Sequence, residues 1–228
     1  MAHYEARLER DLEQIRSKLC DLAEAAQTAV ETASLALFSG DQELSYGVCL
    51  ADHPINRASR SLDKICLGFI AVHLPSAGHL RFVSSAMHIN TELERIGDYA
   101  KTISRESVQL TQPPSGMIRG QLEQVSTEAC RILEQAVSAF KNSDAEAARA
   151  GIRAANEAGR RVHTGFASLV AGEDSATTRE LLCTLIILNC FDRVVDQSKN
   201  ICEETIFAVT GETKAAKSYR VLFLDSDN

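Results

Sequence analysis

Two eight-residue stretches share one pattern of side chains and constrain this chain more than any other feature. Residues 93–100 read Leu-Glu-Arg-Ile-Gly-Asp-Tyr-Ala, and residues 191–198 read Phe-Asp-Arg-Val-Val-Asp-Gln-Ser. Each octet carries an acid, then Arg, then an aliphatic residue, and an Asp four positions after the first acid. An internal repeat indicates that one structural unit is used twice. The equivalent acids, 98 positions apart, are Glu94 and Asp98 in the first copy and Asp192 and Asp196 in the second.

The hydrophobic pattern predicts that each unit consists of long helices. Apolar residues recur at steps of three and four, which is the helical period. Gly, Pro and Asn-Ser-Asp segments interrupt this pattern at five places. Pro54 is expected to kink or break the second helix, because it lacks the backbone N–H that the helix needs. The first expected helix ends near residue 38, and the next three span about 42–73, 76–110 and 116–141. The fifth begins after a cap at Asp144 and runs to about 170, and the sixth spans about 178–209.

Helices of this length joined by short loops bury their apolar stripes best when they pack antiparallel. The predicted fold class is therefore all-α, with six long helices forming two tandem, pseudo-symmetric, antiparallel three-helix bundles. The Pro113-Pro114-Ser115 stretch is the strongest linker signal in the chain. We therefore expect a first three-helix repeat at 1–112, a second at 115–212, and a linker and tail at 213–228.

Composition excludes several classes of protein. The net charge of −7 argues against a nucleic-acid binder, since such proteins usually present a basic surface. The seven cysteines form no Cys-x-x-Cys pair, which favours buried free thiols in a reducing compartment. The N-terminal segment has no apolar signal region, and the longest apolar run is far shorter than the ~20 residues that span a bilayer. We therefore expect a cytoplasmic protein that does not insert into a membrane.

The paired acids of each octet have two possible explanations. Side chains four positions apart lie on one face of a helix, so two carboxylates placed there repel each other and favour a bound cation. Several converging carboxylate oxygens suit hard metal ions, and also iron, manganese or zinc. Alternatively, these acids lie opposite the buried stripe and form a solvated face, with Arg95 and Lys101 sharing the charge. Spacing alone leaves both explanations open.

Other motifs add one possible partner for the acids and no catalytic centre. Asp52 and Asn56 are also four positions apart and lie on the second predicted helix, from which they could face Glu94 and Asp98 across a groove. The chain shows no nucleophile elbow, phosphate-binding glycine loop or zinc-protease helix motif. We therefore expect a protein that is not an enzyme.

Several stretches resemble the PhoU family of phosphate-uptake regulators over roughly residues 5–212. They are Leu-Pro-Ser-Ala-Gly-His-Leu-Arg at 74–81, the two octets, Asn-Ile-Cys-Glu at 200–203 and Val-Thr-Gly-Glu at 209–212. The resemblance implies a cytoplasmic accessory of the high-affinity phosphate ABC transporter. It also implies a negative regulator that acts with a membrane sensor histidine kinase, and a homo-oligomer such as a homodimer.

The same resemblance implies surface metal clusters, often of iron or zinc, held by acid-x-x-x-Asp motifs on two helices of each repeat. By position, the first cluster comprises Asp52, Asn56, Glu94 and Asp98, and Asp192 and Asp196 supply half of the second cluster. The chain departs from the family where His79 replaces a usual Asp, where Asn56 replaces a common acid, and where Asn156 and Arg160 stand in the fifth helix. Uncharged or basic residues weaken a cation site. The first cluster is therefore expected to hold a divalent or trivalent metal better than the second.

The last ten residues carry a second, shorter resemblance. Residues 219–228 are similar to the start of low-molecular-weight tyrosine phosphatases and arsenate reductases, but Asp225 stands where those enzymes have their nucleophilic Cys. A loosely docked tail is the alternative explanation. Two further functions remain open: a metal-free helical scaffold that regulates another partner, and a remnant of a phosphate-ester enzyme, against which the missing Cys and Arg argue.

Overall fold

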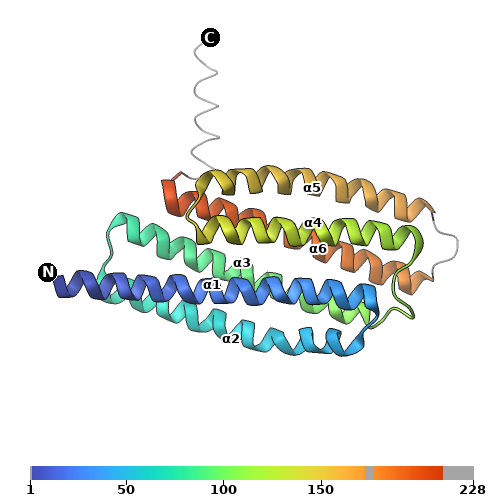
Figure 1. Ribbon diagram of the computed structural model, residues 1–228, viewed down its shortest axis with the longest axis horizontal. Coiled ribbons are helices and arrows are strands. Elements are labelled where there is room, and N and C mark those ends of the chain that lie inside the picture. Colours follow the sequence, from blue (N-terminus) through green and yellow to red (C-terminus); the bar gives the residue numbers. More distant parts are fainter. Residues whose placement is uncertain (1, 173–176, 213–228) are drawn as a thin grey trace, which may run out of the picture.

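The computed structural model describes residues 2–172 and 177–212, which form six α-helices and no strand (Figure 1). The predicted all-α class is therefore confirmed. The helices are α1 (Ala2–Ser39), α2 (Gln42–His73), α3 (Ala77–Ser107), α4 (Gly116–Lys141), α5 (Ala145–Gly172) and α6 (Thr178–Thr210).

The helix ends follow the signals in the sequence. Gly40 follows α1 in the left-handed region of backbone space that glycine tolerates best. The carboxylate of Asp41 then accepts hydrogen bonds from the first backbone amides of α2. Thr177 and Glu180 form a capping box at the start of α6. Gly211, also left-handed, closes the other end of that helix, so the capping box and the two glycine stops match the residue types expected there.

The expected kink or break at Pro54 is corrected in one respect, because α2 runs unbroken from Gln42 to His73. A proline inside a helix leaves the carbonyl four residues earlier without its usual donor. Here that residue is Leu50, which is 70% exposed, so water can reach this side of the helix. Pro54 itself is also exposed. The helix continues because the lost hydrogen bond lies on its solvent side.

The helices form two sets of three that stack on each other (Figure 1). Each of α1, α2 and α3 packs against the other two, and α4, α5 and α6 do the same. Helix α3 lies against α6, and α1 lies against α4, so these two contacts join the sets. One continuous core of mostly Leu, Ile, Val and Ala runs through both sets. Each fully buried Leu or Ile in it contributes roughly 2 kcal/mol of hydrophobic stabilisation.

The contact between α3 and α6 shows how the two repeats are related. Arg81, near the start of α3, lies beside Gly211 at the end of α6. Its repeat equivalent, Arg179, near the start of α6, donates a hydrogen bond to Gln109, just beyond the end of α3. Each arginine, at the start of its own helix, thus contacts the C-terminal end of the other helix. The two helices are therefore antiparallel and related by an approximate two-fold axis.

One glycine in each set allows two helices to approach closely. A Cβ atom at Gly97 would lie 3.1 Å from Cγ2 of Ile55, so α3 and α2 approach closely there. A Cβ atom at Gly151 would lie 2.7 Å from Sγ of Cys202, so α5 and α6 are closer still. A residue larger than glycine would force the helices or their side chains to shift.

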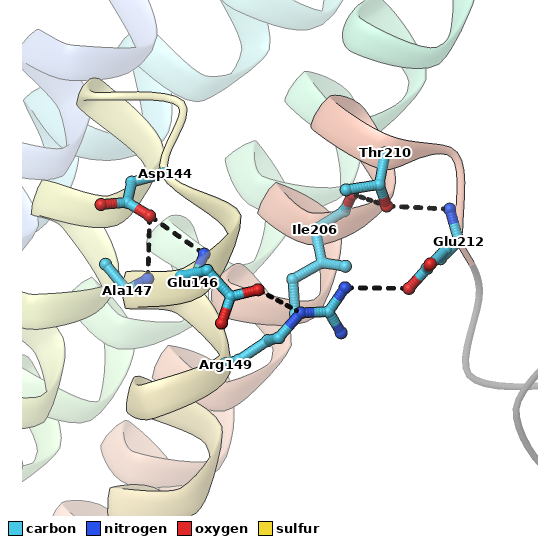
Figure 2. Close-up of polar contacts among 7 residues, drawn as sticks. All are labelled: Asp144, Glu146, Ala147, Arg149, Ile206, Thr210 and Glu212. Atoms are coloured by element: carbon cyan, nitrogen blue, oxygen red, sulfur yellow. Dashed lines mark hydrogen bonds and ion pairs between the residues drawn. The ribbon is translucent and has the colours of Figure 1, made fainter.

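A polar network ties the start of α5 to the end of α6 (Figure 2). Asp144 caps α5, and its Oδ1 accepts from the backbone amide of Glu146 at 2.9 Å. Arg149 donates to Oε1 of Glu146 at 3.2 Å and to Oε2 of Glu212 at 2.9 Å. The backbone amide of Glu212 in turn donates to Oγ1 of Thr210 at 3.1 Å. Arg149 therefore anchors the chain at the point where α6 ends.

Some sequence predictions fall outside these observations. The tail at 213–228, with its resemblance to phosphatases and arsenate reductases, lies outside the described residues. The boundaries proposed for the two repeats stay predictions. None of the helices in the described part of the chain is both long and apolar enough to cross a bilayer.

Candidate functional site

Helices α2 and α3 bring the residues of the first cluster to one place. Asn90, which is fully buried on α3, fixes the register of the two helices. Its Nδ2 donates to the backbone carbonyl of Ser59 at 3.0 Å and to Oδ1 of Asp63 at 2.8 Å, both on α2. In the same register, the face of α2 that carries Asp52 packs against the face of α3 that carries Asp98.

Asp52 is the buried centre of the first cluster, with a side chain only 2% exposed. Its Oδ2 accepts a hydrogen bond from Nζ of Lys101 at 2.7 Å and another from Nδ2 of Asn56 at 3.3 Å. Its Oδ1 receives no hydrogen bond from any described residue, and neither does Oδ1 of Asn56. Two buried oxygens are thus left without a donor, which is costly in a protein interior.

The carboxyl group of Asp98 is affected by burial and by two neighbouring acids. Burial raises the pKa of Asp98, and the charges of Glu94 and Asp52 raise it further. The closeness of the Asp52 and Asp98 carboxyl groups acts in the same direction. The hydrogen bond to Asp52 raises the pKa of Lys101, which stabilises its charged form. The cluster therefore carries more negative charge than the single lysine beside it neutralises.

The first cluster contains suitable ligand atoms for a metal ion, but Lys101 already occupies the position beside Asp52. Three carboxylates and one amide oxygen form a hard donor set. However, the ammonium of Lys101 already contacts the most buried carboxylate, and no three His, Cys, Asp or Glu side chains within the described residues are arranged to hold an ion. To hold a metal, the cluster therefore needs Lys101 to leave Asp52 and the acid side chains to turn toward a common ion.

The second cluster has a different charge. Nζ of Lys199, the equivalent of Lys101, donates to Oδ1 of Asn156 on α5 at 2.6 Å. Asn156 thus takes the place of Asp52, with a neutral amide instead of a carboxylate. Asp196 is exposed and pairs with Arg193 at 3.2 Å. A site with one carboxylate fewer attracts a metal less strongly.

Comparison with known proteins gives the family of this chain. The model of the PhoU domain matches residues 19–107 and, separately, residues 122–205. The chain belongs to the PhoU family. The two matched stretches correspond to the two sets of three helices, so this PhoU-family chain carries the domain twice.

Relatives and solved structures agree over almost the whole length. The phosphate-specific transport system accessory protein PhoU homolog of Pseudomonas aeruginosa is 28% identical over 214 residues, which cover 92% of this chain and 88% of that protein. PhoU of Escherichia coli is 26% identical over 216 residues, with coverage of 92% and 88%. The crystal structure of PhoU from Pseudomonas aeruginosa has a TM-score of 0.85 at 28% identity and covers 90% of this chain and 99% of that one. That of the regulatory protein PhoU from Streptococcus pneumoniae has a TM-score of 0.83 at 25% identity, with coverage of 90% and 98%.

The structure places the predicted site residues of this PhoU-family chain unequally. Asp52, Asn56 and Asp98 meet across the α2–α3 contact, and Glu94 is close enough for its charge to act on Asp98. Asp192 is half-buried on α6, one turn from the exposed Asp196. The expectation of a wholly superficial site needs correction, because Asp52 is buried.

Sequence reasoning missed the role of Lys101, to which it gave only a share of the surface charge. One signal was available, because Lys101 and Lys199 occupy equivalent positions of the two repeats. A lysine three positions after the last acid of each octet lies on the same helix face as that acid. Its partner on α2 could not be identified without the register that Asn90 sets.

The cysteines of the chain do not form a second candidate centre. All seven lie within the described residues as free thiols. Burial raises the pKa of Cys66 and of Cys202 to about 12, and that of Cys130 and Cys190 to about 11. A thiol with so high a pKa is a poor nucleophile and a poor metal ligand near neutral pH. These cysteines therefore act as small core residues.

Proposed function

We propose that this chain is a regulator of phosphate uptake that acts without catalysis, by docking on a component of a phosphate ABC transporter. The observation that carries the proposal is the match of the PhoU domain to both repeats. Relatives that align with 92% of the chain are named accessory proteins of the phosphate-specific transport system. Such agreement over both repeats supports a shared role more strongly than a match to one motif would.

The chemistry of the first cluster supports a non-enzymatic role. It gathers carboxylates, one amide and one ammonium, whereas nucleophilic catalysis needs a nucleophile paired with a base. The burial that raises the pKa of the Cys66 and Cys202 thiols leaves them unreactive. We therefore assign the cluster to ion binding and to positioning α2 on α3.

The proposal extends to a metal ion, for which iron and zinc are the candidates. Asp52, Asn56, Glu94 and Asp98 would hold it in the first repeat. The unpartnered Oδ1 of the buried Asp52 supports this assignment, because a cation would satisfy it. Asp192 and Asp196 would form a weaker second site, since Asn156 replaces the buried carboxylate there.

The remaining parts of the proposal concern location and partners. We place the protein in the cytoplasm, where it would reach both the transporter and a membrane sensor histidine kinase, and where it would restrain uptake as a homo-oligomer. The support is the resemblance of the two octets and the residues around them to PhoU proteins. Two similar three-helix faces would allow one chain to contact two partners at once.

The direct test is to capture the partners in the native cell. The tagged chain would be cross-linked in living cells grown in phosphate-rich medium, purified, and its partners identified by mass spectrometry. We expect subunits of a phosphate transporter to be enriched over a control that carries the same tag on an unrelated helical bundle. Recovery of neither a transporter subunit nor a sensor kinase would contradict the proposal.

One observation favours a second candidate function, a helical scaffold that needs no metal. The Lys101–Asp52 pair already supplies a cation to the first cluster. Elemental analysis of protein purified from native cells separates the two candidates. Iron or zinc bound in proportion to protein supports the metal-binding regulator, and a metal-free protein that still captures a partner supports the scaffold.

A further inference from the structure

We propose that Lys101 is the resident cation of the first cluster, and that a metal ion binds there only by displacing its ammonium group from Asp52. This inference rests on the metal site in the proposed function but not on the transporter. It predicts that the affinity for metal is set by a residue that is not itself a ligand.

The first step is the need of Asp52 for a cation. A carboxylate enclosed in the protein pays a large desolvation penalty unless a charge or several hydrogen bonds compensate for it. Nζ of Lys101 lies 2.7 Å from Oδ2 and provides that charge, whereas Asn56 adds only one neutral hydrogen bond at 3.3 Å. Lys101 therefore takes the role that a metal ion would have.

The second step is that Lys101 can leave. Its side chain is 34% exposed. Its flexible four-carbon stem can turn the ammonium into water without moving α3. Asp52 has no comparable freedom, because its side chain is enclosed between the helices. The pair thus consists of a fixed anion and a mobile cation.

The third step is that a metal would gain contacts that lysine cannot make. An ammonium on Oδ2 leaves Oδ1 of Asp52 and Oδ1 of Asn56 without donors. A metal ion can accept several oxygens at once. Those of Asp98 and Glu94 are among them, and the charges of these two acids already act on each other. Metal binding would therefore satisfy Oδ1 of Asp52 and relieve the repulsion among the acids.

The second repeat provides a matched control. Lys199 is the equivalent lysine, and its Nζ also crosses to the neighbouring helix, where it meets Oδ1 of Asn156 at 2.6 Å. The partner there is the neutral amide of Asn156, whereas Lys101 meets a buried carboxylate. Lys199→Met thus repeats the change in side chain without the proposed effect.

The experiment compares zinc binding by metal-free wild-type protein, Lys101→Met and Lys199→Met, with calorimetry for the affinity and elemental analysis for the amount. Removing one competing positive charge from a partly buried site is worth about one order of magnitude in affinity or more. We expect the Kd for Zn²⁺ of Lys101→Met to be at least tenfold lower than that of wild type. Lys199→Met should keep the wild-type value, and Lys101→Arg, which keeps the charge, should bind weakly like wild type.

A second readout uses only wild-type protein and so does not depend on the folding of a variant. Lysine acylation would be followed by mass spectrometry after a short pulse of an amine-reactive reagent, with and without Zn²⁺. We expect zinc to increase modification of Lys101 at least threefold, because its ammonium is released from Asp52, and to leave Lys199 unchanged. Zinc that binds without increasing modification of Lys101 would overturn the proposal.

The possible outcomes distinguish displacement of Lys101 from the proposed metal site and from docking to the transporter. Equal Kd values for wild type and Lys101→Met, with zinc lost in the double variant Glu94→Ala and Asp98→Ala, would place metal in the cluster but overturn displacement of Lys101. Zinc bound by none of these proteins would overturn both the inference and the metal site. Neither result bears on docking to the transporter, which the cross-linking experiment tests separately.

Discussion

At the residue scale, the pairing of Asp52 with Lys101 shows how unequal two partners of an ion pair can be. The carboxylate is enclosed between α2 and α3, whereas the ammonium lies near the surface. Loss of the exposed partner leaves a buried charge, but loss of the buried charge leaves a lysine that water can solvate. The two halves of the pair should therefore differ in what their removal costs.

This difference can be measured with single substitutions in the absence of metal. Lys101→Met should lower the free energy of unfolding by on the order of 2 kcal/mol, a value that allows for the partial exposure of the lysine. Asp52→Asn keeps the shape and removes the charge, and it should cost less than about 1 kcal/mol. Urea denaturation measures both values. A larger loss for Asp52→Asn than for Lys101→Met would contradict the account of the pair.

The buried cysteines give a prediction about reactivity and pH. Burial raises the pKa of Cys66 and Cys202 to about 12. Almost no thiolate therefore exists at pH 8, and its fraction grows only as the pH approaches that pKa. Iodoacetamide at pH 8 should modify these two cysteines in native protein far more slowly than the half-buried Cys49. Peptide mapping by mass spectrometry measures the labelling rate of each cysteine. Equal labelling of Cys66 and Cys49 in folded protein would contradict the burial of Cys66.

The residues that make the candidate site were predictable by type and spacing but not by environment. Asp52, Asn56, Glu94 and Asp98 could be chosen because acids and amides four positions apart share a helix face. Their burial could not, since it depends on how α2 and α3 meet. That contact depends on the buried Asn90 and on Gly97, which lets α3 approach α2 closely. Both roles arise from tertiary packing, which no local sequence pattern encodes.

At the element scale, the six helices follow local signals in the chain. Glycines at 40 and 211 and the caps at Asp41 and Thr177 each act within one turn, so the sequence alone located these ends closely. Pro54 shows the limit of such reasoning. Whether a proline breaks a helix depends on whether the freed carbonyl can reach water, and this is a property of the packed molecule.

Close contact between α5 and α6 at Gly151 gives a prediction at this scale. Overpacking this contact by Gly151→Ala should destabilise the protein by ~1.5 kcal/mol. The physical reason is that the new Cβ would lie 2.7 Å from Sγ of Cys202, which is buried. Gly120→Ala on α4 is the control, since among the described residues no atom outside its own stretch of helix lies within 4 Å of the new Cβ. That control should stabilise the protein by up to about 1 kcal/mol, because alanine favours the helix.

A double variant tests the cause of that loss. Cys202→Ala removes the opposing sulfur, so Gly151→Ala should cost much less in its presence than in wild type. Urea denaturation of the four proteins of this cycle gives the coupling. Additive effects of the two substitutions would show that the glycine is needed for another reason.

At the scale of the whole molecule, the repeat explains both the architecture and the inequality of its halves. The antiparallel α3–α6 contact places Arg81 and Arg179 in equivalent positions, as two copies of one unit would. Both copies carry the octet, but the lysine of the first copy meets a buried carboxylate and that of the second meets an amide. The repeat was predictable from the octets, and the resemblance also indicated the weaker charge of the second site. The pairing of Lys101 with Asp52 and of Lys199 with Asn156 needed the packed helices.

The most direct test of the central claim is the rate of phosphate uptake in the native cell. Labelled phosphate would be followed in phosphate-rich medium in wild-type cells, in cells that lack this chain, and in cells to which it has been restored. A restraining regulator predicts faster uptake after deletion and a return to the wild-type rate on restoration. An unchanged rate in all three would contradict the account.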